Sequence, residues 1–213
     1  GVRYPEVNIV EVWDGLLNTL AAEGYIETGR EHGRDSGSKT GRGPGIAEAV
    51  RAAFIYEIMS NLSAVMPGAR EIIEVLRGRG MHLGIVSNAQ FYTPLMIEAL
   101  LGASPVHLGF EPEISVWSWK ENEAKPSPRL FEAALAHLRG REGIPAEQVL
   151  YVGNDMRNDI RPSKELGCAT ALFAGDARSL RLRENDESTR GVEPDAIVTE
   201  LRHLDGIVTE KVS

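Results

Sequence analysis

The sequence has almost no cysteine and no long apolar run. Cys168 is the only cysteine among 213 residues, which excludes an internal disulfide framework and fits a reducing compartment. No apolar stretch reaches the roughly 18 residues that a membrane-spanning helix needs, and no signal-peptide pattern stands at the start. We therefore expect a cytoplasmic globular protein.

Positive charge is also scarce. The chain has 23 Lys and Arg residues against 31 Asp and Glu, a net charge of −8. General binding to nucleic acid or to anionic lipid would require a basic surface, so neither is an expected partner. A small anionic substrate stays open, because a local pocket can oppose the global charge. A hydrophobic content of 42% is enough for one sizeable core and a small second lobe.

The N-terminal third predicts two helices around a polar segment. Asn8 and Glu11 have the spacing of a capping box, and apolar residues then recur on one helical face until Gly24. Residues 28–45 contain six glycines and, apart from one proline, no apolar side chain, which predicts a mobile loop. A second helix is expected over residues 46–62.

After Pro67-Gly68, helical segments alternate with short apolar ones. The expected strands are residues 82–88, 112–119, 149–154, 169–175 and 195–200. The expected helices are residues 69–80, 91–102, 127–140 and 161–167. This alternation predicts an α/β fold, a Rossmann-like parallel sheet with helices on both faces. Ligands of such sheets bind beyond the carboxyl ends of the strands.

Polar side chains stand at three places where strands end or helices begin. They are Ser87, Asn88, Lys125 and, in the stretch VGNDMRNDI, Asn154, Asp155, Asn158 and Asp159. A hydroxyl and an amide can hold a phosphate oxygen, and a lysine can neutralise the charge beside it. Hard oxygen ligands can hold Mg²⁺. Each group alone also has a structural explanation, as a turn, a solvated lysine or a helix start.

At these residues the sequence resembles the haloacid dehalogenase-like (HAD) hydrolase superfamily, most of whose members are Mg²⁺-dependent phosphatases. Ser87-Asn88 resembles its second motif, Lys125-Pro126 its third, and Gly153-Asn154 with Asp159 its fourth. The resemblance covers about residues 67–200. It implies that residues 67–213 form the α/β core and that residues 1–66 form a small helical cap domain.

The resemblance also implies roles for the site residues. Ser87, Asn88 and Lys125 would bind the substrate and stabilise the transferring phosphoryl group, and the oxygen-rich turn would hold Mg²⁺. The family usually has Asp where this chain has Asn154, and a neutral amide is a weaker Mg²⁺ ligand than a carboxylate. Either Asn154 serves as the ligand with Asp155 nearby, or Asp155 takes over, and Asp159 orients the site or a bound water.

A second departure concerns the first motif of the family, a strand ending in Asp-x-Asp. It supplies the nucleophile and the general acid and base, and it lies between the strands that end here in Ser87 and Gly153. The nearest match, Asp14-Gly15, is better explained as part of a helix. We therefore expect an upstream polypeptide segment, outside these residues, to complete the sheet. We also expect this chain alone to be inactive; it does not begin with methionine.

The implied function is hydrolysis of a small phosphorylated metabolite through an aspartyl-phosphate. Two alternatives stay open: a dehalogenase that attacks carbon without metal, and a non-catalytic protein that kept the fold. Arg178, Arg181 and Arg183 in ARSLRLRE are typical of a charged helix face, although they can also bind an anion. His203 and Cys168 have no partners visible in the sequence, and we interpret both as structural.

Overall fold

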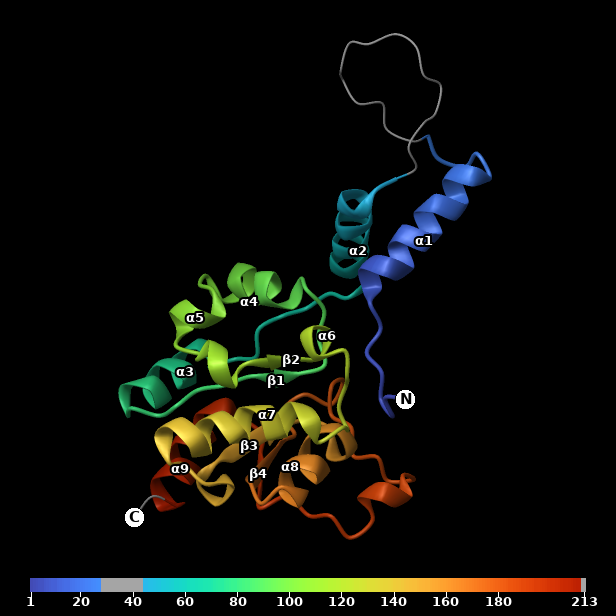
Figure 1. Cartoon of the computed structure of the whole chain (residues 1–213). Coiled ribbons are helices and arrows are strands. Elements are labelled where there is room, and N and C mark those ends of the chain that lie inside the picture. The colour runs from blue at the N-terminus through green and yellow to red at the C-terminus, as the bar shows by residue number, and fades with distance from the viewer. Residues whose placement is uncertain (28–43, 212–213) are drawn as a thin grey trace. The chain divides into compact units, whose positions relative to one another are not determined.

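The computed structural model describes residues 1–27 and 44–211, and these fall into two compact units (Figure 1). The core unit consists of Gly1–Glu6 and Ala64–Ser213, and the helical unit of Val7–Ser63. We expected one division near residue 66, whereas the first six residues belong to the core unit. Most of the predicted mobile loop, residues 28–43, lies outside the described residues.

The helical unit consists of two helices, α1 (Ile9–Ala22) and α2 (Ile46–Ser60). Asn8 caps α1 as predicted, because its Oδ1 accepts hydrogen bonds from the N–H groups of Val10 and Glu11. Trp13 packs on Tyr56 of α2 with ring centroids 5.4 Å apart. The second predicted helix, residues 46–62, is therefore confirmed to within two residues.

The core unit contains two parallel sheets. Its strands are β1 (Val86–Ser87), β2 (Val116–Trp117), β3 (Leu150–Gly153), β4 (Ala169–Phe173) and β5 (Ala196–Val198). β1 pairs with β2, and β4 lies between β3 and β5, all in parallel. The predicted parallel α/β fold is confirmed, but the strands are shorter than expected. The ends of the predicted strand 112–119 are wrong, since residues 112–114 and 118–121 are helical.

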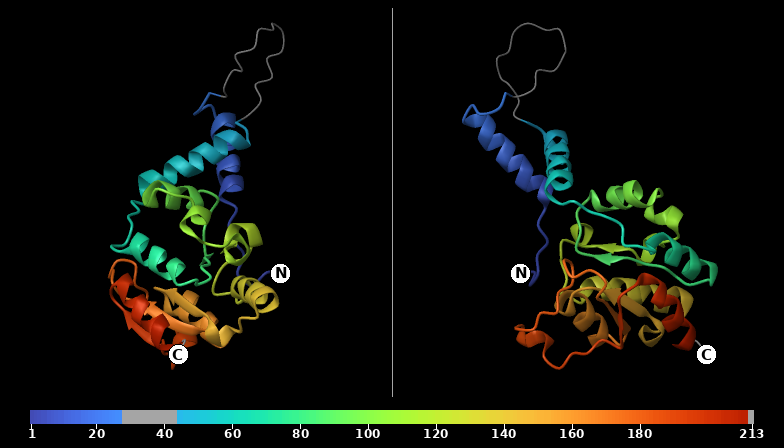
Figure 2. Two further views of the ribbon diagram at one scale, coloured as in Figure 1. Left: turned by 90° about the vertical axis from the view of Figure 1, so that its left-hand side faces the viewer. Right: turned by 180° about the vertical axis from the view of Figure 1, so that it is seen from behind.

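Helices cover these strands, as Figure 2 shows. They are α3 (Ala69–Gly78), α4 (Thr93–Leu101), α5 (Pro105–Leu108), α6 (Ser118–Glu121), α7 (Arg129–His137), α8 (Arg161–Glu165) and α9 (Leu204–Lys211). Single turns of 3-10 or π helix are η1 (Pro112–Ile114), η2 (Leu138–Glu142), η3 (Ala146–Gln148), η4 (Met156–Ile160), η5 (Glu187–Thr189) and η6 (Leu201–His203). None of the helices in the described ranges combines the length and apolar character that crossing a bilayer demands.

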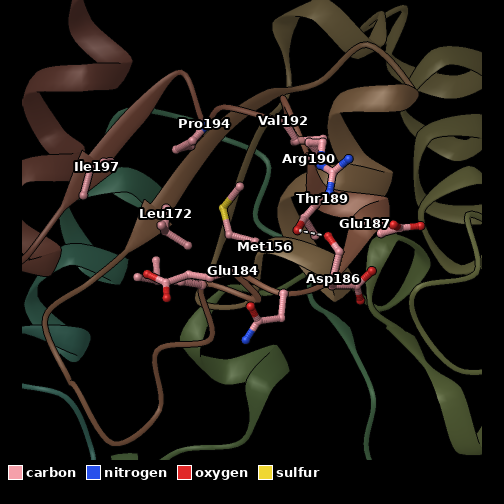
Figure 3. Close-up of a pocket in the computed structure, with 12 residues that line it drawn as sticks. Met156, Leu172, Glu184, Asp186, Glu187, Thr189, Arg190, Val192, Pro194 and Ile197 are labelled. Atoms are coloured by element: carbon pink, nitrogen blue, oxygen red, sulfur yellow. Dashed lines mark hydrogen bonds between the residues drawn. The ribbon is translucent and has the colours of Figure 1, made fainter.

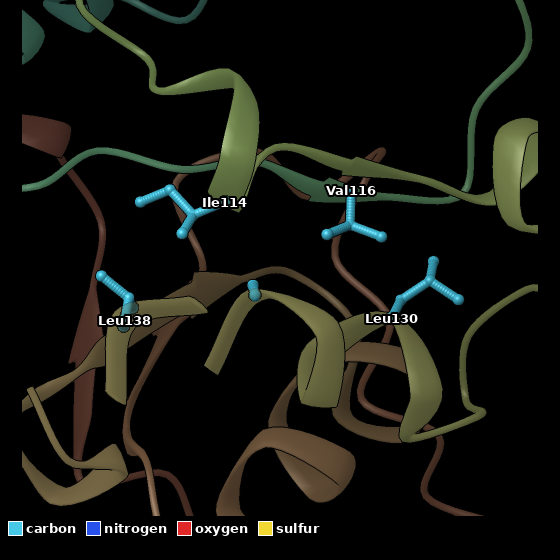
Figure 4. Close-up of a cluster of buried hydrophobic side chains, with 5 residues drawn as sticks. Ile114, Val116, Leu130 and Leu138 are labelled. Atoms are coloured by element: carbon cyan, nitrogen blue, oxygen red, sulfur yellow. The ribbon is translucent and has the colours of Figure 1, made fainter. Parts of the chain in front are cut away.

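The buried core shows that both faces of the sheet are covered. Successive side chains of a strand point to opposite faces. Ala171 of β4 packs with Ile72 of α3 and Leu204 of α9, whereas the next residue, Leu172, packs with Met156 of η4. A third cluster joins α7 to β2 through Leu130, Ala134, Leu138, Ile114 and Val116 (Figure 4). The alternation of helices and strands therefore gives the layered arrangement that the sequence predicts.

The strands β1 and β3 are less buried than their pairing partners β2 and β4. Both residues of β2 are buried and β4 is mostly buried, whereas β1 and β3 are only half-buried throughout. Within the described part of the chain, β1 pairs with no strand but β2, and β3 with none but β4. The carbonyl of Ile85 accepts from Val116 of β2, so the backbone groups of Val86 point to the other edge.

Candidate active site

Lys125 lies where the predicted motif residues meet. Its Nζ is 2.6 Å from Oδ1 of Asp159, 3.0 Å from the carbonyl oxygen of Val86 and 3.2 Å from the hydroxyl of Tyr151. The side chains of Lys125 and Asp159 are 10% and 7% exposed. A nearly dry ion pair is stable only with good geometry and further hydrogen bonds, because both charges lose their hydration. The lysine therefore joins the ends of β1 and β3.

Asn88 holds the backbone of Lys125 from the end of β1. Its Oδ1 accepts from the N–H of Lys125 at 2.6 Å, and its Nδ2 donates to the carbonyl of Lys125 at 3.1 Å. The neighbouring Ser87 is half-buried, and its hydroxyl makes a long contact of 3.4 Å with the carbonyl of Asn88. The predicted second and third motifs are thus in direct contact, and the peptide bond after Lys125 is cis.

Asp159 closes the turn that follows β3. Its Oδ2 accepts from the N–H groups of Asn154 and Asp155 at 3.1 and 3.0 Å. Gly153 makes this closeness possible, because a Cβ at that position would lie 2.4 Å from Cβ of Asp159. The carboxylate is thus fixed on one side by the turn and on the other by Lys125.

Asp155 is buried and is engaged by Arg183. The guanidinium donates from Nη2 to Oδ2 at 2.6 Å and from Nε to Oδ1 at 3.1 Å. Oδ1 also caps η4 by accepting from the N–H groups of Arg157 and Asn158. Burial alone would raise the pKa of Asp155, but these hydrogen bonds from Arg183, Asn158 and Arg157 outweigh it and lower the pKa below its ordinary value.

The arginine-rich run is not a helix, so the predicted helix face is wrong. Its backbone instead pairs with the segment that follows β3: the N–H of Arg181 donates to the carbonyl of Asn154, and the carbonyl of Arg181 accepts from the N–H of Met156. The Nδ2 of Asn154 donates to the carbonyl of Ser179 at 2.7 Å. The run therefore forms one wall of the oxygen-rich turn, a contact that a local charge pattern cannot show.

Tyr151 is a site residue that the sequence interpretation missed. Its hydroxyl lies 3.0 Å from the carbonyl of Val86 and 3.3 Å from Oδ1 of Asp159. Burial, and next the charge of Asp159, raise the pKa of this phenol well above its ordinary value, so it stays protonated. The available signal was a lone hydroxyl in an otherwise apolar strand, three residues before the oxygen-rich turn.

The oxygen-rich turn fits only part of a metal site. The described residues hold no group of three His, Cys, Asp or Glu side chains placed to bind a metal ion. Asp155 is committed to Arg183, and Asp159 is shared between Lys125 and two backbone N–H groups. Asn154 donates from its Nδ2 to the carbonyl of Ser179. Neither carboxylate stands free to attack phosphorus.

A cavity of the described residues lies elsewhere, beneath the loop that precedes β5 (Figure 3). It has a volume of about 540 Å³, with Met156 and Leu172 on its floor and Glu184, Asp186 and Glu187 at its rim. Ser87, Asn88 and Lys125 are not among its lining residues. This cavity is therefore separate from the contacts of Lys125 with Asn88 and Asp159.

Comparison with known proteins assigns the chain to a family. The model of haloacid dehalogenase-like hydrolases matches residues 13–167. The chain belongs to this family. Phosphoglycolate phosphatase from Haemophilus influenzae is 29% identical over 138 residues, which are 64% of this chain and 57% of that protein. Ribulose-1,5-bisphosphate 5-phosphatase from Halopiger xanaduensis is 25% identical over 166 residues, 78% of this chain and 65% of that protein.

Solved HAD structures have the same fold. The HAD-hydrolase YfnB from Bacillus subtilis, in a structure bound to magnesium, matches with a TM-score of 0.53 at 16% identity, covering 93% of this chain and 80% of that one. At such identity the likeness concerns the fold alone. The chain spans less than two thirds of the length of the two phosphatases above.

Proposed function

We propose that this chain is the larger part of a Mg²⁺-dependent phosphohydrolase that acts on a small phosphorylated metabolite through an aspartyl-phosphate. The observation that carries the proposal is the junction of Lys125 with Asp159 at 2.6 Å and with Asn88, at the ends of β1 and β3. A buried ammonium group held in this way can stabilise the charge of a transferring phosphoryl group. Two relatives named as phosphatases support the same reaction.

The nucleophile of the proposed reaction comes from an added strand between β1 and β3. Both strands have an edge without a strand partner in the described part of the chain, and both are only half-buried. A parallel strand there would pair with these edges and bury them. Its carboxyl end would meet Lys125, since parallel strands end at the same edge of a sheet.

The first residues of the chain pair with the segment that precedes Lys125. The carbonyl of Tyr4 accepts from the N–H of Ala124, and the N–H of Glu6 donates to the carbonyl of Asn122. This segment therefore runs beside the loop that leads into Lys125.

The site residues then have distinct roles. Lys125 and the hydroxyl of Ser87 contact the phosphoryl oxygens. Asn88 acts as a positioning residue, because both polar atoms of its amide are used on the backbone of Lys125. Asn154 offers its Oδ1 to Mg²⁺ in preference to Asp155, whose carboxylate is taken by Arg183. The ion would neutralise phosphoryl charge, with its other ligands supplied by the added strand and by water.

We also propose a cytoplasmic location. Cys168 is a buried free thiol, and burial raises its pKa to about 11, so it is a poor nucleophile. A lone unpaired thiol fits a reducing compartment.

The test compares the 213-residue chain with a longer chain that also includes the residues encoded upstream in the same gene. We expect no turnover of p-nitrophenyl phosphate by the former and Mg²⁺-dependent turnover by the latter, lost on Lys125→Ala and in EDTA. Dehalogenation of a 2-haloacid that survives EDTA would replace the proposal with the dehalogenase alternative. Mg²⁺-dependent turnover by the short chain that is lost on Lys125→Ala would disprove the added nucleophile.

A further inference from the structure

Each of the three N–H donors of the Lys125 ammonium group already has an acceptor. The group carries three donors, and three acceptors surround it: Oδ1 of Asp159 at 2.6 Å, the carbonyl of Val86 at 3.0 Å and the hydroxyl of Tyr151 at 3.2 Å. A phosphoryl oxygen can bind this group only if one of these acceptors gives way.

The three acceptors differ in strength. Asp159 is charged and gives the shortest contact, and such hydrogen bonds are roughly twice as strong as neutral ones. The carbonyl of Val86 is fixed in the backbone of β1. Tyr151 is neutral, the most distant of the three and carried by a side chain, so it is the acceptor that yields at the lowest cost.

The hydroxyl of Tyr151 keeps a hydrogen bond when it releases Lys125. It has one hydrogen to donate, and the carbonyl of Val86 accepts it at 3.0 Å. If Lys125 turns its third N–H elsewhere, the phenol keeps this bond and no buried polar atom is left unsatisfied. The ring stays packed edge-on against Phe131 of α7, with centroids 4.9 Å apart.

We propose that Tyr151 is a positioning residue that holds the ammonium group of Lys125 in place and stands in for the phosphoryl oxygen until substrate binds. The holding role follows from the contacts above and is independent of the reaction. The stand-in role rests on the proposed function.

The holding role is tested by the rate at which acetic anhydride modifies Lys125 in the 213-residue chain at one pH, followed by peptide mass spectrometry. Tyr151→Phe frees one N–H and keeps the ring, so we expect modification roughly fivefold faster, the factor of one net hydrogen bond. Phe131→Leu loosens the ring but keeps the hydroxyl, and it is the matched control. Lys164, paired with Asp195 at 2.9 Å, is the internal standard.

The outcomes separate a specific role from a structural one. A rate in Tyr151→Phe equal to that of the wild type, or an equal acceleration in Phe131→Leu, overturns the holding role. Circular dichroism that shows a lost fold in Tyr151→Phe shifts the test to Tyr151→Met, which also removes the hydroxyl and leaves an apolar side chain in its place. A rate equal to that of the wild type there overturns the role as well.

The stand-in role is tested by calorimetric titration with orthophosphate. Because phosphate need not displace the phenol from Lys125, Tyr151→Phe is expected to bind it severalfold more tightly than the wild type. Weaker or unchanged binding overturns the stand-in role. If neither protein binds phosphate, the stand-in role fails, while turnover by the extended chain still decides the proposed function and the acetylation rates still decide the holding role.

Discussion

The side chain of Asn88 acts as a clamp on the backbone of Lys125. One amide group satisfies both the N–H and the C=O of a residue 37 positions further along the chain, at 2.6 and 3.1 Å. The lysine backbone is thus fixed to the end of β1, and its Nζ returns to the carbonyl of Val86 in the same strand. Two segments of the chain are locked together before any ligand arrives.

We predict that Asn88→Ala destabilises the core unit by about 1–3 kcal/mol, because two hydrogen bonds are lost and each contributes roughly 0.5–1.5 kcal/mol. Urea unfolding followed by tryptophan fluorescence measures the change. Asn88→Asp is the matched control: it retains the acceptor for the N–H of Lys125 and loses the donor, so it should lie between the alanine variant and the wild type. An alanine variant as stable as the wild type would show that the clamp contributes nothing.

Lys125→Met should be more costly. It leaves the carboxylate of Asp159, 7% exposed, without its cation, and removal of one partner of a buried pair typically costs about 3–5 kcal/mol. Arg202→Met removes one partner of an exposed pair, with side chains 74% and 52% exposed, and should change the free energy of unfolding by less than about 1 kcal/mol. Equal losses in the two variants would mean that the Lys125–Asp159 pair is not dry.

The positions where strands end in polar residues could be predicted from the sequence, because they depend on local patterns. Apolar runs followed by Ser87-Asn88 or by the turn after Gly153 predict where a parallel sheet places its polar side chains. The contacts between the site residues could not be predicted from the sequence. Arg183 reaches Asp155 across 28 positions and Lys125 reaches Val86 across 39, and no local period encodes such pairs.

The predicted strand lengths and the predicted helix at the arginine-rich run were wrong for a related reason. The segment 82–88 is apolar enough for a strand, but only Val86 and Ser87 form one, because their partner β2 is itself only two residues long and is flanked by helical turns. The run around Arg181 has the charges of a helix face. Its backbone bonds to Asn154 and Met156 hold it extended instead, since tertiary pairing overrides weak local preference.

Gly153→Ala should disrupt the turn after β3. The added Cβ would lie 2.4 Å from Cβ and 2.5 Å from Cγ of Asp159, a clash with a carboxylate that is fixed by two backbone N–H groups. We expect a large loss of stability or failure to fold, measured by the midpoint of thermal unfolding. Gly140→Ala is the control, because nothing lies within 4 Å of the added atom. Equal midpoints for the two variants would contradict the tight packing at Gly153.

Asp195 makes the stability of the core unit depend on pH in the acidic range. Its Oδ1 accepts from Lys164, and its Oδ2 accepts from the N–H and the hydroxyl of Thr170, which ties β4, β5 and α8 together. The hydrogen bond from Lys164, and those from Thr170, lower the pKa of Asp195 from 3.8 to about 2. A carboxyl whose folded pKa is depressed stabilises the fold above its unfolded pKa, and this contribution is lost as the pH falls through the folded value.

Asp195→Asn should therefore destabilise the protein at pH 6 and progressively less between pH 4 and pH 2, because the wild type loses its advantage there while the amide does not titrate. Urea unfolding of both proteins at several pH values measures the difference. Glu193→Gln, an exposed neighbour two residues away, controls for the removal of one negative charge and should show no such convergence. A stability difference between wild type and Asp195→Asn that stays constant from pH 6 to pH 2 would mean that Lys164 and Thr170 do not bind the ionised form selectively.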